Sequence, residues 1–438
     1  MESPFKNLYF FAFVLVALSI GILEWRQVAP LSIKKSNEST RTVAISDPFL
    51  RMTFAGYQGW FGAEGDGVLG WWSHWTKGGI PSPGNVTFEL YPDVSDYPSD
   101  TLFDTELILP NGNAGKLFSS SKLAVTDLHF KWMSEYEIDG VALQRFVVDI
   151  SYPAVKKHFD TVAKNVRTSA EKYNKKFYTQ YDISGCASWE ICATIIKEDI
   201  FWIESELVVS PSYARNGNDR PVIGLWGVGF REGVHPGTTE QVIELVSFLK
   251  QRGFVVLGGV PYGWRTEDRD SKPNFLKAYL TFDIIQPWSV GRFKNETEVD
   301  ADAKDRLKED IRFTTSLGIG YQRPLFAGFA WSNWNGGPKN EIPRMGGDFY
   351  WHQAYHVYKA GASSYIAMFD EYDEGTAIAK AAKNSTMIPT NQHFLSLDAD
   401  ELSLPSDHYL WLAGQAAAMF KGEIEPTSEQ PVRIFSPQ

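Results

Sequence analysis

The sequence contains little cysteine, little histidine and no excess of positive charge. Among 438 residues there are two cysteines and eight histidines, and the formal net charge at pH 7 is −11. The histidines are scattered, and no Cys/His cluster has the spacing of a zinc site, so nothing in the sequence requires a metal or another cofactor. The acidic balance argues against a nucleic-acid partner, because phosphate contacts need a basic surface. We therefore expect no metal, no cofactor and no nucleic acid.

An apolar run without charged residues covers positions 8–23 and follows Lys6. Its 16 residues are few for a spanning helix and many for the core of a signal peptide. No small-x-small cleavage site follows, because Glu24, Trp25 and Arg26 come at once. Membranes of the early secretory pathway are thin enough for a short span. The pattern predicts an uncleaved membrane anchor over residues 1–25, with a cleaved signal peptide as the alternative.

Other features agree with a lumenal or extracellular domain. The sequence holds four N-x-S/T acceptor sites for N-glycosylation, at Asn37, Asn85, Asn295 and Asn384. Cys186 and Cys192 are close enough in sequence to close a small disulfide loop in an oxidising compartment, and two buried free thiols are the equally weighted alternative. We expect a single-pass protein of the Golgi or endoplasmic reticulum with a lumenal catalytic domain; a secreted protein is the alternative.

Polar residues over 26–46 predict a stem or linker, after which one folded domain is expected over 47–424 and a short tail over 425–438. Short apolar runs rich in β-forming residues alternate with longer helical patterns, which is typical of a parallel sheet. The expected strands are 53–60, 140–147, 176–181, 222–226, 255–260, 283–288, 325–330 and 365–369. Helical patterns cover 154–173, 239–252, 301–317 and 350–360.

Eight such strands predict the α/β fold class, as a (β/α)₈ TIM barrel. The segment 62–128, after the first strand, is too long for an ordinary barrel loop, and we expect this insertion to lie over the rim and form one wall of a cleft. It contains His74 in a cluster of aromatic residues. His74 is a candidate substrate contact, with a packed, hydrogen-bonded histidine as the plainer reading.

The expected strands deliver amides, acids, guanidinium groups and large rings to the rim where barrel enzymes build their active sites. Aromatic rings give flat platforms for sugar rings, and amides, Arg and Asp pair with hydroxyl groups. Any one of these side chains is more often a packing residue, but their recurrence at matching positions favours a carbohydrate site. The candidates for substrate binding are Tyr57, Gln58, Trp60, His74, Gln144, Arg145, Tyr181, Asp182, Trp226, Tyr262, Trp264, Arg265, Trp288, Trp331, Asn333 and Asp370.

Four acids follow the last expected strand within five positions: Asp370, Glu371, Asp373 and Glu374. Glu371 and Glu374 are three residues apart, so one tight turn can direct both into the same cleft. When two carboxylates lie so near each other, their mutual repulsion drives their pKa values apart. One is then suited to act as a general acid and the other as a general base. Such pairs cleave glycosidic bonds. Acids that cap the first turn of a helix are the alternative.

The segment FDEYDEGT (369–376) resembles the last-strand signature F-N-E-W-x-E-G-T of glycoside hydrolase family 99, the endo-α-mannosidases, and resembles more closely the broad group of family 71/99-like proteins. YQGWFG (57–62) is similar to the opening strand of that family. Further segments similar to the broad group are HFKWMSEYEIDGVALQRF (129–146), GVPYGWRT (259–266), IIQPWSVGRF (284–293), GFAWSNWN (328–335) and LPSDHYLWLAG (404–414). Together they run from about residue 51 to 424.

The resemblance implies a retaining hydrolase of α-linked glycans that works through the 2-hydroxyl of the substrate. On that pattern Glu371 is the base that activates this hydroxyl, and Glu374 is the acid that protonates the leaving oxygen and then activates water. Asp370 occupies the position where the mannosidases have Asn, and Asp373 adds a charge between the two glutamates. Three functions remain: an endo-α-mannosidase-like enzyme, a glycoside hydrolase for another glycan such as an α-glucan or a pentose-containing chain, and a catalytically silent lectin-like barrel. The expected partners are an oligosaccharide or glycan and, through the N-terminal segment, a membrane.

Overall fold

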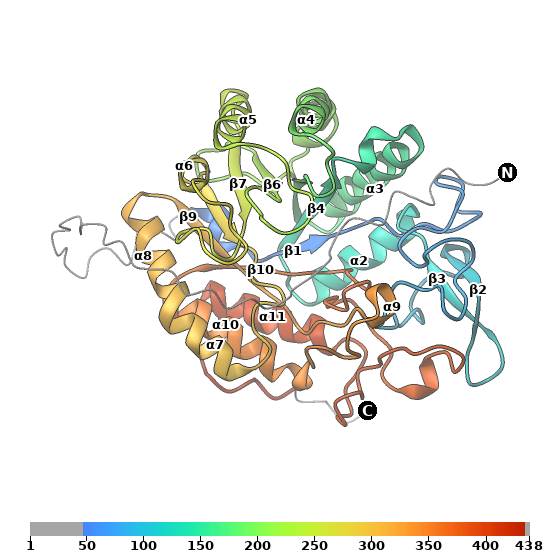
Figure 1. The fold of residues 1–438 in the computed structure, drawn as a ribbon. Helices are drawn as coiled ribbons and strands as arrows, with labels where there is room; N and C mark the ends of the chain where they lie inside the picture. The colour runs from blue at the N-terminus through green and yellow to red at the C-terminus, as the bar shows by residue number, and fades with distance from the viewer. Residues whose placement is uncertain (1–46, 434–438) are drawn as a thin grey trace.

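Eight parallel strands close into a barrel at the centre of the computed structural model, which describes residues 47–433 (Figure 1). Around the barrel the strands follow the order β1-β10-β9-β8-β7-β6-β5-β4. This confirms the (β/α)₈ barrel expected from the sequence. The barrel strands are β1 (Phe54–Tyr57), β4 (Gly140–Phe146), β5 (Lys176–Asp182), β6 (Val222–Trp226), β7 (Val255–Val260), β8 (Ile284–Pro287), β9 (Gly320–Leu325) and β10 (Ser363–Ile366).

Two strands begin earlier in the chain than their apolar runs indicate. β9 covers Gly320–Leu325, whereas the apolar run at 325–330 lies after it, so the strand expected there is wrong. The strand contains Pro324 and a buried Arg323, both of which are unusual in central strands. β10 starts at Ser363 and ends at Ile366, because the buried Ser363 and Ser364 continue the pairing with β9. The acids at 370–374 therefore lie on a loop that leaves the strand four residues earlier.

Helices cover the outside of the barrel between the strands, as Figure 1 shows for α3, α4 and α5 along one side and α7 and α10 along another. Local capping fixes several starts: Ser188 caps α4, Asn295 caps α7, and Thr238 with Gln241 forms a capping box on α5. The helices are α1 (Pro48–Arg51), α2 (Leu123–Glu135), α3 (Pro153–Lys172), α4 (Trp189–Ile203), α5 (Thr239–Gln251), α6 (Leu276–Tyr279), α7 (Glu296–Asp302), α8 (Lys308–Ser316), α9 (Ser332–Asn335), α10 (Asp348–Ala360) and α11 (His408–Lys421).

The expected long insertion is present between β1 and α2 and packs beside the barrel (Figure 1). It contains a two-stranded antiparallel hairpin, β2 (Leu102–Ile108) and β3 (Ala114–Phe118). Short bridges join Pro92 to Ala381 and Leu90 to Leu395, so the insertion lies against the segment that follows β10. The insertion and the acidic loop are thus held by a common set of backbone contacts.

His129 of α2 joins the insertion to the barrel. Its Nδ1 atom lies 2.9 Å from the Tyr57 hydroxyl of β1, and its Nε2 atom lies 2.6 Å from the Tyr97 hydroxyl of the insertion. All three side chains are buried. Burial lowers the pKa of His129 to about 3, so the ring is neutral at physiological pH. A neutral imidazole donates from one nitrogen and accepts at the other, which satisfies both tyrosine hydroxyls in turn.

The interior of the barrel contains a row of glutamines. The Gln180 Nε2 atom lies 3.4 Å from Gln286 Oε1, and Gln286 Nε2 donates to Gln322 Oε1 at 2.8 Å. Because Gln180 is on β5 and Gln286 is on β8, their contact crosses the interior. Gln144, paired in register with Gln180, donates to Ala142 O and to the Tyr365 hydroxyl, both at 3.2 Å. This polar layer marks the inward-facing positions of the strands.

Arg145, one residue after Gln144, points the opposite way, into the layer between the barrel and its helices. Its guanidinium donates to both Asp199 oxygens at 2.6 and 2.5 Å and to Asp160 at 2.7 Å. Asp199 also accepts from the Tyr181 hydroxyl at 2.9 Å and lies 3.4 Å from the Lys156 ammonium. A buried bidentate pair of this kind links β4 and β5 to α3 and α4.

The N-terminal predictions lie outside the described residues. These are the anchor at 1–25, the stem at 26–46 and the acceptor Asn37. Within 47–433 no helix is long and apolar enough to cross a membrane. At the other end, part of the expected tail contacts the domain, because Trp351 Nε1 donates to Thr427 O at 3.0 Å and Arg433 pairs with Asp407.

We expect Asp199→Ala to lower the free energy of unfolding by about 3–5 kcal/mol, because it leaves the buried Arg145 charge without its bidentate partner. Chemical denaturation measures this loss. The matched control is Asp127→Ala, which removes a surface ion pair with Lys172 and a hydrogen bond from the Tyr173 hydroxyl and should cost much less. Equal losses in the two variants would contradict a buried structural role for the Arg145 pair.

Candidate active site

The loop after β10 is attached to the end of β1 by its first acid. Asp370 is fully buried and accepts from the backbone N–H groups of Gln58 at 2.7 Å and Gly59 at 3.0 Å. Gly59 has a positive φ of 61°, which suits the sharp turn there. Burial raises the pKa of Asp370 to about 7, although the two N–H donors oppose that rise. Because both of its oxygens are used by the backbone, Asp370 positions the loop.

Glu371 is held in a fixed orientation at the base of the site. One of its oxygens accepts from Gln58 Nε2 at 2.5 Å, and the other accepts from the backbone N–H of Glu374 at 3.2 Å. The side chain is 2% exposed. Burial and the charges of Asp373 and Glu374 raise its pKa well above the usual value, while the two donors lower it. These donors specifically favour the ionised form of Glu371.

Glu374 is half-buried at the edge of the same loop. Its carboxylate has no hydrogen-bond partner among residues 47–433, whereas its backbone carbonyl accepts from Ala330 N at 2.8 Å. Burial, with a further contribution from the Asp373 charge, raises the pKa of Glu374 to about 7. Glu371 and Glu374 therefore form an interacting pair in which only Glu371 has protein donors. Burial and mutual repulsion raise the pKa of both carboxyl groups, so the two titrate as a coupled pair.

Asp373 turns away from the two glutamates and binds the insertion. Its Oδ2 atom lies 2.9 Å from His74 Nδ1, and its Oδ1 atom accepts from the Thr87 hydroxyl at 3.0 Å. The Thr87 hydroxyl also contacts the His74 carbonyl oxygen. Burial raises the pKa of Asp373, opposed by His74 and Thr87. His74 has a φ of 60°, an unusual conformation for a residue with a side chain, and Asp373 and Thr87 hold it there.

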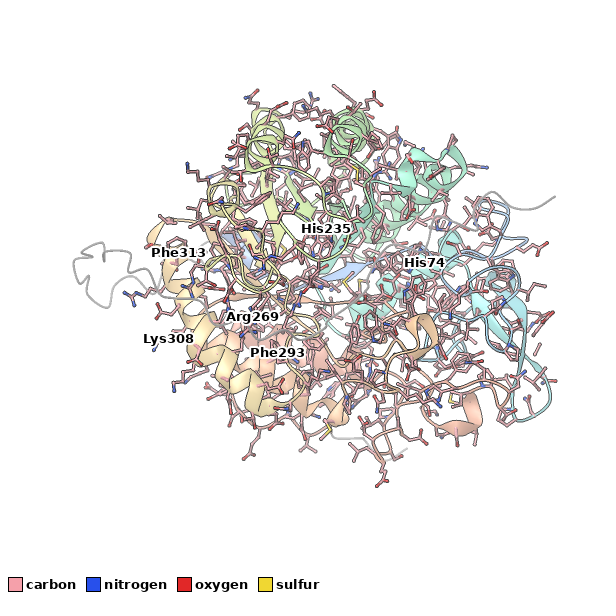
Figure 2. All side chains as sticks on the ribbon, viewed as in Figure 1. His74, His235, Arg269, Phe293, Lys308 and Phe313 are labelled. Atoms are coloured by element: carbon pink, nitrogen blue, oxygen red, sulfur yellow. A yellow bond between two sulfur atoms is a disulfide. The ribbon has the colours of Figure 1, made fainter. Side chains whose placement is uncertain are left out.

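An aromatic stack stands next to this ion pair. The His74 ring lies parallel to Trp60, with 3.7 Å between centroids and 3° between planes, and Trp60 stacks on Phe146 at 5.0 Å. Trp60, His74 and Phe146 are all half-buried. Figure 2 shows His74 between the end of β1 and the insertion. The three rings thus form a continuous aromatic stack beside the acidic loop, to which His74 is bound through Asp373.

Two further acids lie at the carboxyl ends of strands: Asp149 shortly after β4, and Asp182 as the last residue of β5. Asp182 is buried and accepts from Ser184 N at 2.7 Å and from Ser184 Oγ at 2.5 Å. Burial raises the pKa of Asp182 to about 7 and that of Asp149 to about 6. The Asp149 charge adds to the rise at Asp182, and His74 partly offsets the rise at Asp149. His74 therefore lies within electrostatic reach of acids on both sides of the site.

A second group of rings lies at the ends of β6 and β8. Trp226 is 5.4 Å from Trp288 in an edge-to-face arrangement, and it also contacts Phe230 at 4.9 Å and His235 at 5.8 Å. The indole Nε1 of Trp226 is buried and has no hydrogen-bond partner among the described residues. Trp288 remains half-buried. Because all barrel strands are parallel, these rings share a rim with Trp60 and the acidic loop.

Several candidate residues point instead into the outer layer of the barrel. Arg145 and Tyr181 both bind Asp199 there. Tyr262 donates to Asp302 at 2.5 Å, while Trp264 and Arg265 both bind Asp310, at 3.1 and 2.6 Å. Each of these side chains attaches a strand or loop to a helix, so none lies beside the glutamate pair.

Other candidates are occupied within the core or by the insertion. Tyr57 binds His129, and Gln144 belongs to the interior glutamine layer. Asn333 Nδ2 donates to Phe88 O and to His393 O, both at 2.8 Å, and Trp331 Nε1 donates to Glu341 at 2.8 Å. The structure thus gathers Gln58, Trp60, His74, Asp182, Glu371 and Glu374 at the rim, with Asp370 beneath them.

Asp149, Thr87 and Phe146 lie in the site but are absent from the candidates predicted from sequence. A signal existed for Asp149, since it is an acid three residues beyond the end of β4. Thr87 carries no such signal, because it enters from the insertion, 286 positions before its partner Asp373. Within residues 47–433 the one group of three metal-ligating side chains lies on the outer helices and not at this site.

A depression with a volume of about 500 Å³ lies along α3 on the outside of the barrel. Three lysines, Lys156, Lys157 and Lys164, line it together with Asp160. None of its lining residues belongs to the acidic site.

The same barrel occurs in solved glycoside hydrolase structures. The family 99 endo-α-mannosidase of Bacteroides thetaiotaomicron superimposes with a TM-score of 0.62 at 14% identity, covering 85% of this chain and 98% of that one. The complex of that enzyme with bis-tris-propane gives a TM-score of 0.60 at 15% identity, with the same coverage. No protein-family model and no curated protein sequence matches the chain. At this identity the likeness is one of fold, and it agrees with the family 99-like resemblance of the sequence.

Of the two alternatives for the cysteines, a disulfide or two free thiols, the structure contains the disulfide. Cys186 and Cys192 are joined by a disulfide, which closes the loop between β5 and the first turn of α4. The loop starts two residues after Ser184, the hydroxyl donor to Asp182. The bond thus restrains the chain next to one of the acids of the site.

Asp182→Asn should remove part of the pH dependence of stability. An acid whose pKa is raised by folding contributes stability below its unfolded pKa, and this contribution is lost as pH rises through the folded value of about 7. Asn still accepts from Ser184 but does not ionise. We expect wild type to lose up to about 4 kcal/mol more than Asp182→Asn between pH 4 and pH 8, measured by chemical denaturation.

The exposed Asp100→Asn variant is the control for this comparison and should follow the wild-type curve. Parallel curves for wild type and Asp182→Asn would mean that Asp182 is ionised in the folded protein across this range.

Proposed function

We propose that the protein is a retaining glycoside hydrolase of α-linked glycans, with endo-α-mannosidase-like action as the first specificity to test. The observation that carries the proposal is the pair Glu371 and Glu374 on one loop at the strand ends of a (β/α)₈ barrel, with donors on Glu371 alone. Its fold likeness to a family 99 endo-α-mannosidase supports the same reaction class.

In the first step Glu371 takes the proton of the substrate 2-hydroxyl, and that oxygen attacks the anomeric carbon. The glycosidic bond breaks, and Glu374 donates its proton to the departing oxygen, leaving a 1,2-anhydro sugar. In the second step Glu374 takes a proton from water as the water oxygen bonds to the anomeric carbon. The strained ring opens, and its oxygen regains the proton from Glu371. Two inversions give net retention of configuration.

The electrostatics of the pair suit these roles. Glu371 has Gln58 Nε2 and the Glu374 N–H as donors, which oppose the rise that burial causes in its pKa. Glu374 has no such donor, and its pKa of about 7 keeps a large share of it protonated at neutral pH. A general acid works best when its pKa is near the working pH. The proposed turnover starts with carboxylate at Glu371 and carboxylic acid at Glu374.

The two additional acids of the loop are compatible with an uncharged glycan. Asp370 is bound by the backbone at Gln58 and Gly59, and Asp373 is bound by His74 and Thr87. Neither carboxylate is directed by these contacts toward the substrate. Internal cleavage of a longer chain is part of the same proposal and is supported by the fold likeness to the family 99 endo-α-mannosidase.

Glu374→Gln should lower kcat at least about 100-fold on unactivated glycans while leaving glycan affinity within a few-fold of wild type, because the amide fills the same space but cannot donate the proton. Turnover is followed by product release from α-mannosides, α-glucosides and N-glycans, and binding by calorimetry. The anomer first formed, observed by NMR, reports retention.

The exposed Glu64→Gln variant of the insertion makes the same chemical change away from the pair and should keep wild-type kcat. If the enzyme releases a glucose- or pentose-containing product and no mannoside, the protein is a glycoside hydrolase of another specificity. Glycan binding with no product from any substrate would identify a lectin and refute the hydrolase proposal.

The pH profile tests the assignment of the acid. Activity should fall as pH rises through about 7, because Glu374 loses the proton that it must donate. Asp373→Asn removes a negative charge that raises the Glu374 pKa, so the alkaline limb of kcat/KM should move to lower pH. Asp96→Asn, on an exposed pair with Lys380, should leave the limb in place. If the alkaline limb does not move in Asp373→Asn, a group other than Glu374 is the acid that titrates there.

For location we propose the lumen of the secretory pathway. The disulfide between Cys186 and Cys192 and the acceptor sequences support an oxidising, glycosylating compartment. Asn384 uses only its oxygen, for Thr386, whereas Asn85 uses its amide nitrogen for two carbonyl groups. Asn295 is exposed at the start of α7, but its amide nitrogen donates to Glu298 at 3.1 Å. We therefore assign a glycan to Asn384 in preference to Asn85 and Asn295.

A further inference from the structure

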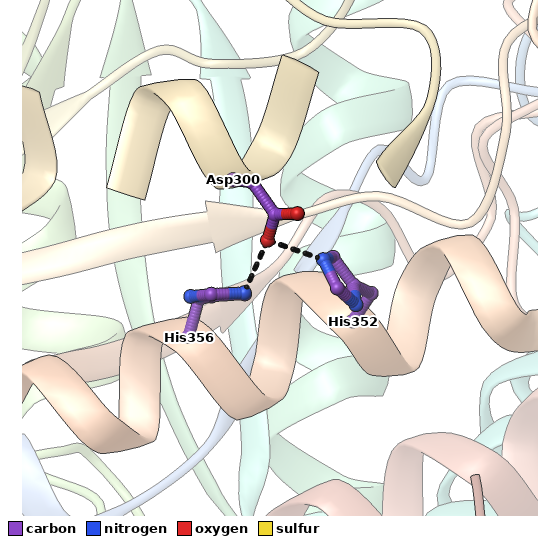
Figure 3. A group of neighbouring side chains, drawn as sticks. All are labelled: Asp300, His352 and His356. Carbon is purple, nitrogen blue, oxygen red and sulfur yellow. Dashed lines mark hydrogen bonds and ion pairs between the residues drawn. The ribbon is translucent and has the colours of Figure 1, made fainter. Parts of the chain in front are cut away.

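An imidazole and carboxylate cluster lies on the outer helices, away from the proposed active site (Figure 3). His352 and His356 are one turn apart on α10, and Asp300 reaches toward both from α7. Asp300 Oδ1 lies 2.9 Å from His352 Nε2 and 2.8 Å from His356 Nε2. The three side chains are 58%, 20% and 27% exposed in the order Asp300, His352, His356, so an ion in solution can reach them.

We propose that Asp300, His352 and His356 form a binding site for a divalent transition-metal ion, with Zn²⁺ as the first candidate. One ligand atom from each residue lies within 4.8 Å of the other two. Zinc binds imidazole nitrogen and carboxylate oxygen at about 2.0–2.2 Å in tetrahedral geometry, so three such ligands need to move little to surround one ion. The fourth position is left to water.

The histidine spacing is favourable for a metal because positions four apart share one face of a helix. The two rings already meet, with 4.7 Å between their centroids. Both Nε2 atoms also face the same oxygen of Asp300. The three ligand atoms therefore already converge on one point, which is where a single cation would bind.

The tautomers needed for metal binding are available. A ring that coordinates through Nε2 carries its hydrogen on Nδ1. Among residues 47–433 neither His352 nor His356 uses Nδ1 in a hydrogen bond, so either proton can move there without breaking a contact. A ring whose Nδ1 accepts from a protein group would lack this freedom.

The position of the cluster gives the ion a structural role. Asp302, two residues after Asp300, binds Arg323 of β9 at 2.6 Å and the Tyr262 hydroxyl, from the loop after β7, at 2.5 Å. α7 is only seven residues long and passes directly into a π-helical turn at Ala303–Leu307. An ion that joins Asp300 to α10 would fix this short helix, and with it the anchor of Arg323 and Tyr262.

The test uses untagged protein dialysed against a chelator, with ZnCl₂ and CoCl₂ as the probes. We expect one equivalent of zinc by calorimetry, visible absorption bands from bound cobalt, and a rise of a few degrees in Tm with zinc. The double variant His352→Ala/His356→Ala should lose the cobalt bands and the Tm rise, and weaken zinc affinity at least about tenfold.

Two single variants separate metal binding from a plain hydrogen-bonded cluster. Asp300→Asn keeps an oxygen that accepts from the rings but is a poor zinc ligand, so its Tm without metal should match wild type while the zinc-dependent rise is lost. His393→Ala disrupts a different histidine–carboxylate pair, with Glu89, and should bind zinc as wild type does. Equal zinc uptake by wild type and the double variant, or no uptake by wild type, would overturn the proposal.

Discussion

The cost of removing carboxylates from water governs the arrangement of this site. Asp370, Glu371 and Asp373 are each at most 5% exposed within one short loop, and such burial disfavours ionised acids unless donors compensate. Each acid meets this cost differently: Asp370 through backbone N–H groups, Glu371 through an amide, and Asp373 through His74. Glu374, which has no donor, is the acid that remains half-buried at the surface of the site.

Apart from the Glu374 N–H, the groups that donate hydrogen bonds to the acids of the loop lie outside the loop. Gln58 follows β1, and His74 and Thr87 belong to the insertion. The insertion therefore influences the electrostatics of the site, because its His74 and Thr87 oppose the rise that burial causes in the pKa of Asp373, whose charge in turn raises the pKa of Glu374. This chain of influence runs through contacts between segments about 300 positions apart in sequence.

The barrel, the insertion and the acidic loop could be predicted from sequence because alternating patterns and clustered acids are local signals. The direction of single side chains could not. Gln144 and Arg145 are neighbours at the end of β4, yet one faces the interior and the other the helices, since successive side chains alternate across a strand. Tyr262, Trp264 and Arg265 point outward toward acids on α7 and α8 that no local pattern reveals. Strand β9 has no clear apolar pattern, because Arg323 and Pro324 interrupt it. The sequence therefore predicts a strand at 325–330 in place of Gly320–Leu325.

The neutral His129 bridge has a consequence for how the insertion responds to its surroundings. Tyr57, His129 and Tyr97 carry no charge at neutral pH and are buried, so dissolved ions neither screen nor compete with their hydrogen bonds. Their directed sequence of donors and acceptors also lets the imidazole proton sit on either nitrogen if both hydroxyls rotate together. The attachment of the insertion to the barrel through His129 is thereby insensitive to ionic strength.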